Sequence, residues 1–153
     1  MRDTKKTPIY LRWWFILLVV AIAFNVLVNV SQIYYRQLRA AGHIFYEEGL
    51  WATPGKAVTY CWIIEVKEPT EVEAYMTGRN ILWLYKLAPE TPRIRCLSPT
   101  YYEERGAELM LWKDGAFEEV RLQLSPGEYM LIIITKKDIP WSYAFTVGLR
   151  KIA

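Results

Sequence analysis

The sequence predicts a single N-terminal transmembrane α-helix followed by an all-β antiparallel sandwich of jelly-roll-like form. Three observations predict it: an uncharged apolar run over residues 13–30, a series of alternating apolar segments after Gly42, and turn signals between those segments. The 153 residues have room for about one domain plus an anchor. A composition that is 53% hydrophobic excludes a disordered chain.

Charge is distributed unevenly along the chain, whose net charge is +3. Residues 1–43 contain six Lys or Arg and one acid, whereas residues 44–153 contain 13 basic and 15 acidic residues. The basic excess therefore flanks the apolar run, which indicates membrane orientation and contact with membrane lipid. It argues against nucleic-acid binding by the domain, so we expect no nucleic-acid partner.

The apolar run WWFILLVVAIAFNVLVNV is predicted to form a transmembrane helix over residues 13–35 that continues as helix to about residue 42, where Gly42 is the stop signal. A cleaved signal peptide is the alternative, but its A-x-A match, Ala21-Ile22-Ala23, lies inside the run and not at its end. Aromatic side chains that suit the two membrane interfaces bracket the run: Tyr10, Trp13, Trp14, Tyr34 and Tyr35.

The larger positive charge precedes the helix. Four Lys or Arg lie in the basic tail, residues 1–12, and two arginines, Arg36 and Arg39, follow the span. Because positive charge is retained on the inner side, the tail is expected in the cytoplasm. We therefore expect a single-pass protein of the cell inner membrane, with the sandwich of residues 44–153 in the periplasm or outside the cell.

A polar stripe runs along the predicted helix. Asn25 and Asn29 are four residues apart and Gln32 follows at the same 3/4 spacing, so their side chains share a face. Polar side chains within a span usually face another helix, because an unpaired amide in hydrocarbon is costly. We expect these three to dock against partner helices, and Arg36 and Arg39 to meet acidic groups or lipid phosphates. The alternative is a solitary anchor with two tolerated asparagines.

Residues 44–153 have the pattern of seven to nine β-strands and no helical pattern after Gly42. Asp114-Gly115 is a hairpin signal, and the Ser-Pro-Gly of residues 125–127 is a second turn. In residues 57–66 the alternate positions Val58, Tyr60, Trp62, Ile64 and Val66 form one apolar face. The strand candidates are residues 57–66, 70–76, 81–87, 107–113, 116–124, 128–135 and 141–150.

Two stretches, EPTEVEAYMTGRNILWLYKL (68–87) and LQLSPGEYMLIIITKKDIPWSYAFTVGL (122–149), resemble the bacterial pre-peptidase C-terminal domain, a jelly-roll-like sandwich of secreted proteins. The second stretch has that family's closing pattern: a strand, a Pro-Gly turn, an aromatic-apolar strand and a final Tyr-x-Phe-x-Val strand. The resemblance implies a sandwich fold and an extracytoplasmic, non-catalytic role. Where the family often carries an acidic pair, this chain has Leu87-Ala88-Pro89, so no calcium site is carried over.

Residues that could carry chemistry are few. His43, the single histidine, lies at the predicted helix end, where it would continue the polar stripe, and no nucleophile turn is near it. With no cofactor or metal motif present, we expect no cofactor and no enzyme activity. Cys61 and Cys96 lie in separate strand candidates and are candidates for an intradomain disulfide, the alternative being two buried free thiols.

Acidic pairs occur at Glu47-Glu48, Glu103-Glu104 and Glu118-Glu119. Neighbours on a strand point to opposite faces, so only a bulge or a loop would bring such a pair together. Of the three pairs, Glu103-Glu104 is the one candidate for a ligand or metal site, although solvated charge is the favoured interpretation. The reason is that SPTYYEERG has the composition of a loop, in which Tyr101 and Tyr102 could also bind a sugar or a protein. The same tyrosines could instead cover an end of the sandwich.

The expected function is a non-catalytic accessory or scaffolding subunit of a larger membrane protein complex, which docks by its helix and braces the complex with a periplasmic sandwich. The expected partners are integral membrane subunits, in a hetero-complex or a homo-oligomer. The alternative is a membrane-anchored extracytoplasmic module that binds a carbohydrate or protein ligand. A third reading, a pilin-like filament subunit, lacks the expected processing site and the acidic residue near the mature start.

Overall fold

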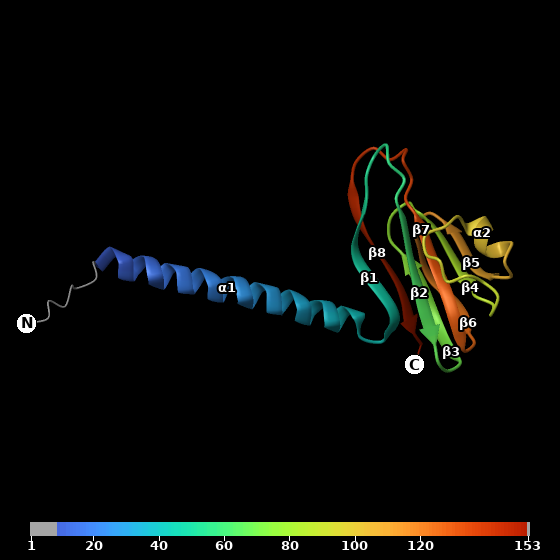
Figure 1. Cartoon of the computed structure of the whole chain (residues 1–153), viewed down its shortest axis with the longest axis horizontal. Coiled ribbons are helices and arrows are strands. Elements are labelled where there is room, and N and C mark those ends of the chain that lie inside the picture. Colours follow the sequence, from blue (N-terminus) through green and yellow to red (C-terminus); the bar gives the residue numbers. More distant parts are fainter. Residues whose placement is uncertain (1–8, 153) are drawn as a thin grey trace, which may run out of the picture. The chain divides into compact units, whose positions relative to one another are not determined.

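The computed structural model describes residues 9–152, with side chains from Leu11 onward, as two units divided between Ala41 and Gly42. The first unit contains α1 (Ile9–Ala40), a helix of 32 residues (Figure 1). The prediction of one long apolar helix is confirmed. The helix already begins within the predicted tail of residues 1–12, of which residues 1–8 lie outside the described residues.

The helix ends at Ala40, three residues before His43. Gly42 has a φ of +78°, a backbone conformation that glycine adopts without a steric penalty and that commonly ends helices. The following residue opens the first strand. The prediction that His43 continues the polar stripe of the helix is therefore wrong, because the chain leaves the helical path after Ala40.

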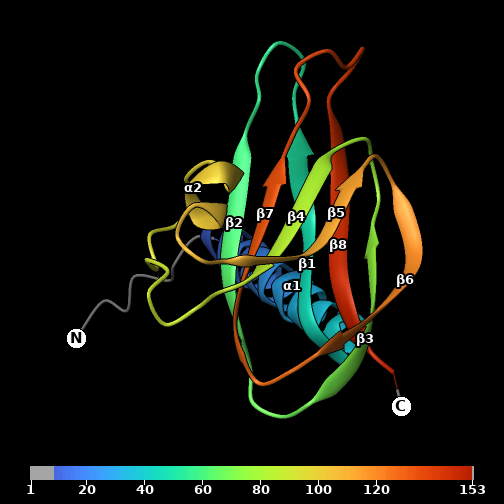
Figure 2. The same ribbon diagram turned by 90° about the vertical axis from the view of Figure 1, so that its right-hand side faces the viewer.

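The second unit is a sandwich of two four-stranded antiparallel sheets (Figures 1 and 2). One sheet has the strand order β1-β8-β3-β6 and the other has the order β2-β7-β4-β5. This is the arrangement of an eight-stranded jelly roll, so the predicted fold class is confirmed. The elements are β1 (His43–Ala52), β2 (Thr59–Val66), β3 (Thr70–Met76), β4 (Ile81–Lys86), α2 (Pro99–Glu103), β5 (Glu108–Asp114), β6 (Phe117–Leu124), β7 (Gly127–Ile134) and β8 (Tyr143–Lys151).

Strand pairing is nested, since β1 pairs with β8, β2 with β7, β3 with β6 and β4 with β5. Among the described strands that follow one another in sequence, only β4 and β5 pair; every other connection crosses between the sheets. The hairpin predicted at Asp114-Gly115 is therefore wrong. Gly115, with a φ of +102°, donates its N–H to the main-chain oxygen of Asn80 at 2.9 Å and leads into the opposite sheet.

Two elements differ from the sequence prediction. β1 was not among the strand candidates, because its alternation is interrupted by a bulge between Glu47 and Leu50, where Gly49 has a φ of +71°. α2 contradicts the expectation of no helix after Gly42. With Pro99 at its start it is a single short turn, too brief to show a helical periodicity.

The core between the two sheets follows the apolar alternation of the sequence. In β2, Ile64 and Val66 are buried, with Tyr60 and Trp62 packed against the same core, as predicted for that face. Full burial of such a side chain contributes roughly 1.5–3 kcal/mol. The other buried members are Ala52, Val72, Ala74, Met76, Leu82, Leu84, Leu111, Leu124, Tyr129, Leu131, Ile133, Ile139, Phe145, Val147 and Leu149.

On the outer face of the β1-β8-β3-β6 sheet, the ring of Tyr75 lies across Gly148, its partner in the ladder. A Cβ atom built at position 148 would be 2.5 Å from Cζ and from the hydroxyl oxygen of Tyr75. The same hydroxyl is 2.9 Å from Nε2 of His43, which holds the ring in place. The absence of a side chain at position 148 is therefore what allows the ring to lie flat on the sheet.

Gly148→Ala is expected to lower the free energy of unfolding by about 1–3 kcal/mol, because the added methyl group overlaps the Tyr75 ring. Urea denaturation of the full chain in detergent, followed by tryptophan fluorescence, measures the change. In a Tyr75→Ala background the same substitution should cost much less, since the space is then empty. An equal loss in both backgrounds would contradict this steric account.

Candidate functional site

Asn25 and Asn29 are hydrogen-bonded to each other along α1. Nδ2 of Asn29 donates to Oδ1 of Asn25 at 2.7 Å and to the main-chain oxygen of Asn25 at 2.8 Å. Both N–H groups of Asn29 are thereby used. Within residues 11–152, no partner is present for Nδ2 of Asn25, Oδ1 of Asn29 or the amide of Gln32. The helix by itself satisfies only half of the hydrogen-bonding groups of the asparagine pair.

The predicted interfacial aromatics Trp13, Trp14, Tyr34 and Tyr35 are all exposed on α1. Trp13 and Tyr34 are 21 positions apart, which is roughly 32 Å at about 1.5 Å per residue and close to the thickness of bilayer hydrocarbon. The side chain of Tyr10 lies outside the described residues. The spacing of these rings suits a helix whose two ends lie at two membrane interfaces.

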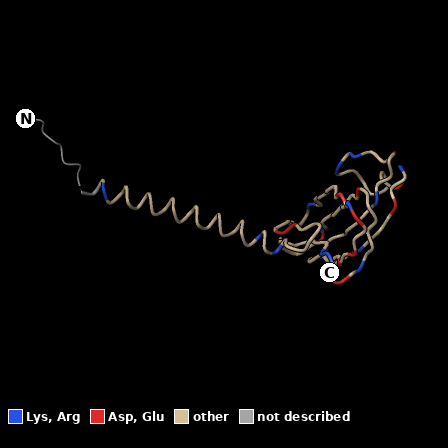
Figure 3. Tube along the Cα trace, turned by 90° about the horizontal axis from the view of Figure 1, so that it is seen from below, with Lys and Arg blue, Asp and Glu red and all other residues tan. Residues whose placement is uncertain are grey.

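Residues 11–40 form a helix that is long and apolar enough to cross a membrane. Figure 3 shows no charged residue along α1 between Arg12 and the last turns. Arg36 and Arg39 are exposed in those turns, and Arg39 lies in the last one, where a cation is favoured by the helix dipole.

Residues 87–107, between β4 and β5, cover the outer face of the β2-β7-β4-β5 sheet and include α2 (Figure 2). A second apolar cluster lies beneath this segment. It combines side chains of the sheet with side chains of the segment, which makes the segment part of the packed domain and not a free loop. Its buried members are Tyr85, Leu87, Tyr102, Met130 and Ile132.

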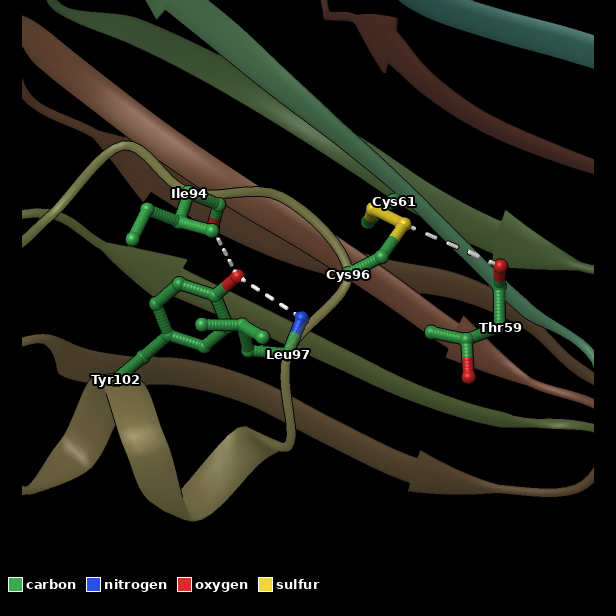
Figure 4. The surroundings of a disulfide bond; sticks show 6 residues. All are labelled: Thr59, Cys61, Ile94, Cys96, Leu97 and Tyr102. Carbon is green, nitrogen blue, oxygen red and sulfur yellow. Dashed lines mark hydrogen bonds between the residues drawn. A yellow bond between two sulfur atoms is a disulfide. The ribbon is translucent and has the colours of Figure 1, made fainter.

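A disulfide bond fastens this covering segment to β2 (Figure 4). It joins Cys61 in β2 to Cys96, with Cα atoms 5.4 Å apart, so neither cysteine is a free thiol. The expectation that Cys96 lies in a strand is wrong. It lies between β4 and α2 with a φ of +61°, because the segment turns there to reach the sheet.

Tyr102 is fully buried and organises the segment from within (Figure 4). Its hydroxyl donates to the main-chain oxygen of Ile94 and accepts the N–H of Leu97 at 3.3 Å. The expectation that Tyr102 is an exposed ligand-binding aromatic is therefore wrong. The alternative, that it covers the sandwich, is correct in kind, but the surface it covers is the outer face of a sheet and not an end.

Glu103 and Tyr101 are also engaged by the domain. Glu103 accepts the hydroxyl hydrogen of Tyr85 at 2.7 Å, and burial together with this bond raises the pKa of Tyr85 above its ordinary value. The guanidinium of Arg105 lies over the ring of Tyr101, 3.6 Å from the ring centre, in a cation–π contact. Glu104 is exposed, and its carboxylate forms an ion pair with the same Arg105 at 3.8 Å. The predicted ligand loop is thus a packed helical turn.

The acidic pair that a bulge brings together is Glu118-Glu119. The register of β6 against β3 shifts between Ala74 and Met76, so that both glutamates lie opposite Tyr75. Sequence reasoning favoured a different pair because no residue type marks this bulge. Within residues 11–152, no group of three or more His, Cys, Asp or Glu is placed to hold a metal ion. The hollow beside the bulge is lined by Glu73, Tyr75, Glu118, Glu119 and Arg150.

A cleft of about 350 Å³ lies at the end of the sandwich away from His43, where the β3–β4 and β7–β8 connections meet. Sequence reasoning missed it because Trp141 was placed in a strand, whereas β8 begins at Tyr143. A signal was present, since Pro140 before a large aromatic and a serine suits a loop better than a strand. The lining includes Gly78, Arg79, Lys136, Asp138, Trp141 and Tyr143.

The double substitution Cys61→Ser and Cys96→Ser is expected to lower the free energy of unfolding by about 4 kcal/mol. The disulfide closes a loop between two residues 35 positions apart, and without it the unfolded chain gains conformational entropy. Urea denaturation of the full chain measures the loss. Reductant should lower the stability of the wild-type chain by a similar amount and leave the double variant unchanged. A wild-type chain indifferent to reductant would show that the bond contributes nothing.

A scan against protein-family models finds no match to the chain, and a search of the curated proteins finds none either. The resemblance of residues 68–149 to the pre-peptidase C-terminal domain therefore stays a prediction.

Proposed function

We propose that this protein is a membrane-anchored, non-catalytic accessory or scaffolding subunit of a larger membrane protein complex. In this proposal α1 crosses the membrane once and docks against helices of other subunits, while the jelly roll braces the complex on the far side. The observation that carries the proposal is the face formed by Asn25, Asn29 and Gln32, which lies in an apolar helix with part of its hydrogen-bonding capacity unused.

The asparagine pair is well suited to a facing helix. Because Asn29 donates to Asn25, the pair leaves Nδ2 donors on one residue and an Oδ1 acceptor on the other. A single amide or hydroxyl side chain on a partner helix can bond to both. Such interhelical bonds contribute about 1 kcal/mol each in membranes, and they add to van der Waals packing of the two helices.

Two features support a domain outside the cytoplasm. The greater positive charge lies in residues 1–12, before the span, and positive flanks are retained in the cytoplasm. The Cys61–Cys96 disulfide is of the kind that persists in oxidising compartments and is rare in the cytosol. We accordingly assign residues 44–153 to the periplasm or the cell exterior.

Introduced cysteines test this orientation in intact cells. Lys67→Cys, at an exposed position after β2, should react with a membrane-impermeant maleimide added outside the inner membrane, because the domain lies there. Thr4→Cys, in the tail, should react only with a permeant reagent. Labelling is read by the mass of the purified chain. The reverse pattern would overturn the orientation and leave the helix assignment intact.

Gentle detergent extraction followed by native mass measurement tests the docking. The wild-type chain should migrate in a particle with other subunits, and Asn25→Leu with Asn29→Leu should release it, because the polar face is then lost. Val26→Leu with Val30→Leu is the matched control, with the same four-residue separation on a neighbouring apolar face. A bare wild-type monomer, or a double leucine variant that stays in the particle, would refute the proposal.

A second candidate function, a membrane-anchored module that binds a ligand outside the membrane, is favoured by one observation. The jelly roll has a cleft of about 350 Å³ beside an exposed tryptophan, Trp141. The volume of this cleft lies within the range of small-ligand sites. In this function the span is only an anchor. Its replacement by another apolar helix should then leave ligand binding unchanged.

A further inference from the structure

We propose that the cleft beside Trp141 binds a neutral carbohydrate, with a pyranose ring stacked on the indole and its hydroxyl groups bonded to Arg79 and Asp138. This inference rests on the second candidate function, the anchored binding module, and it names the ligand class of that module.

The indole of Trp141 is 70% exposed in the β7–β8 connection, next to Pro140 and the buried Ile139. Large aromatic side chains normally bury most of their area, so an indole left in water on a braced loop is a surface available for contact. A pyranose ring presents a flat face of C–H groups of similar size. Stacking that face on the indole removes apolar area from water on both partners.

The charges of the cleft select the ligand's chemistry. Arg79 and Asp138 both line it, and neither side chain has an ion-pair or hydrogen-bond partner within residues 11–152. The charge of Lys136, by contrast, is matched by Asp114, with Nζ 2.5 Å from Oδ1. An anion would satisfy Arg79 but face a carboxylate, and a cation would satisfy Asp138 but face a guanidinium. A hydroxyl group both donates and accepts, so a neutral polyol satisfies both.

The β7–β8 connection is braced by the β1–β2 connection beside it (Figures 1 and 2). Gly55 donates its N–H to the main-chain oxygen of Lys137 at 2.7 Å. Thr135 bonds twice to Val58, through its main-chain N–H at 3.0 Å and through Oγ1 at 2.8 Å. Loops held in this way lose little conformational entropy when a ligand binds.

The β3–β4 connection is held by Tyr143. The tyrosine hydroxyl accepts the N–H of Arg79 at 3.0 Å and donates to Oδ1 of Asn80 at 2.9 Å. Gly78 packs against the same ring, since a Cβ there would be 2.6 Å from Cε2 of Tyr143. The backbone that carries Arg79 is therefore fixed relative to the strand that follows Trp141.

Asn80 lies directly behind this wall of the cleft. The residue is fully buried, and its Nδ2 is the one buried side-chain polar atom without a partner among the described residues. The atom is 3.3 Å from the position that a Cβ of Gly78 would take, and Gly78 lines the cleft. An orphaned buried amide costs free energy, and a water that bridges Nδ2 to a ligand in the cleft would remove that cost.

Isothermal titration calorimetry on the full chain tests the inference, in a detergent that has no sugar head group. The neutral probes are cellotriose, chitotriose and mannotriose, and the charged comparators are trigalacturonate and spermidine. At least one neutral trisaccharide should bind with a Kd in the millimolar range or below, and more tightly than either charged probe. Failure of all three to bind, or tighter binding of a charged probe, would overturn the inference.

Variants place the binding in the cleft. Trp141→Ala should weaken binding of the best trisaccharide about tenfold or more, because stacking and apolar burial are lost together. Trp112→Ala is the matched control, since that indole is 52% exposed on β5 and does not line the cleft. Urea denaturation confirms that both variants are folded. Equal effects of the two substitutions would overturn the assignment to this cleft.

Replacing residues 13–35 with a polyleucine span separates the ligand class from the function on which it rests. Retained trisaccharide affinity in the replaced chain supports both. If the native chain binds a trisaccharide and the replaced chain does not, the claim that the span is only an anchor is refuted. The ligand class then still stands. If neither chain binds a trisaccharide, the ligand class is refuted. The proposal that Asn25 and Asn29 dock against partner helices is unaffected, because native mass measurement tests it separately.

Discussion

Burial of β7 on both faces is the constraint on which the rest of the domain depends. Residues 129–133 are consecutive and all buried, although a strand turns successive side chains to opposite faces. Tyr129, Leu131 and Ile133 pack against the opposite sheet, whereas Met130 and Ile132 point the other way. A sheet with two apolar faces needs a cover on each. Residues 87–107 supply the second cover, and the Cys61–Cys96 bond holds it there.

The nested pairing of the strands explains where the surfaces of interest lie. Connections that leave β1, β3, β5 and β7 all reach the same end of the sandwich, because odd-numbered and even-numbered strands run in opposite directions. The cleft is built from two of these connections. Another braces it through Gly55, and Asp114 at the end of β5 pairs with Lys136. Residues more than 50 positions apart in the sequence thus converge without any local signal in the sequence.

The two proposals draw on different parts of the chain and on the same physical rule. In α1 the unused polar groups of Asn25 and Asn29 lie in an apolar helix, and in the jelly roll the unpartnered groups of Arg79, Asp138 and Asn80 lie in or behind a cleft. Polar groups removed from water are stable when they are hydrogen-bonded. In the two proposals, a partner helix would supply the missing hydrogen bonds to the asparagines. A ligand in the cleft would replace water at the exposed side chains of Arg79 and Asp138.

The sequence by itself determined the helix, most of the strands and the two cysteines available for a bond. These features follow from local periodicity, from turn residues and from the presence of two cysteines in the chain. It did not determine that Asp114-Gly115 crosses between sheets, that Tyr102 and Glu103 are packed inward, or that Glu118-Glu119 lies on a bulge. Those outcomes depend on which strands pair and which face is covered. Only the tertiary structure decided them, because the competing arrangements have the same local pattern and differ in long-range burial.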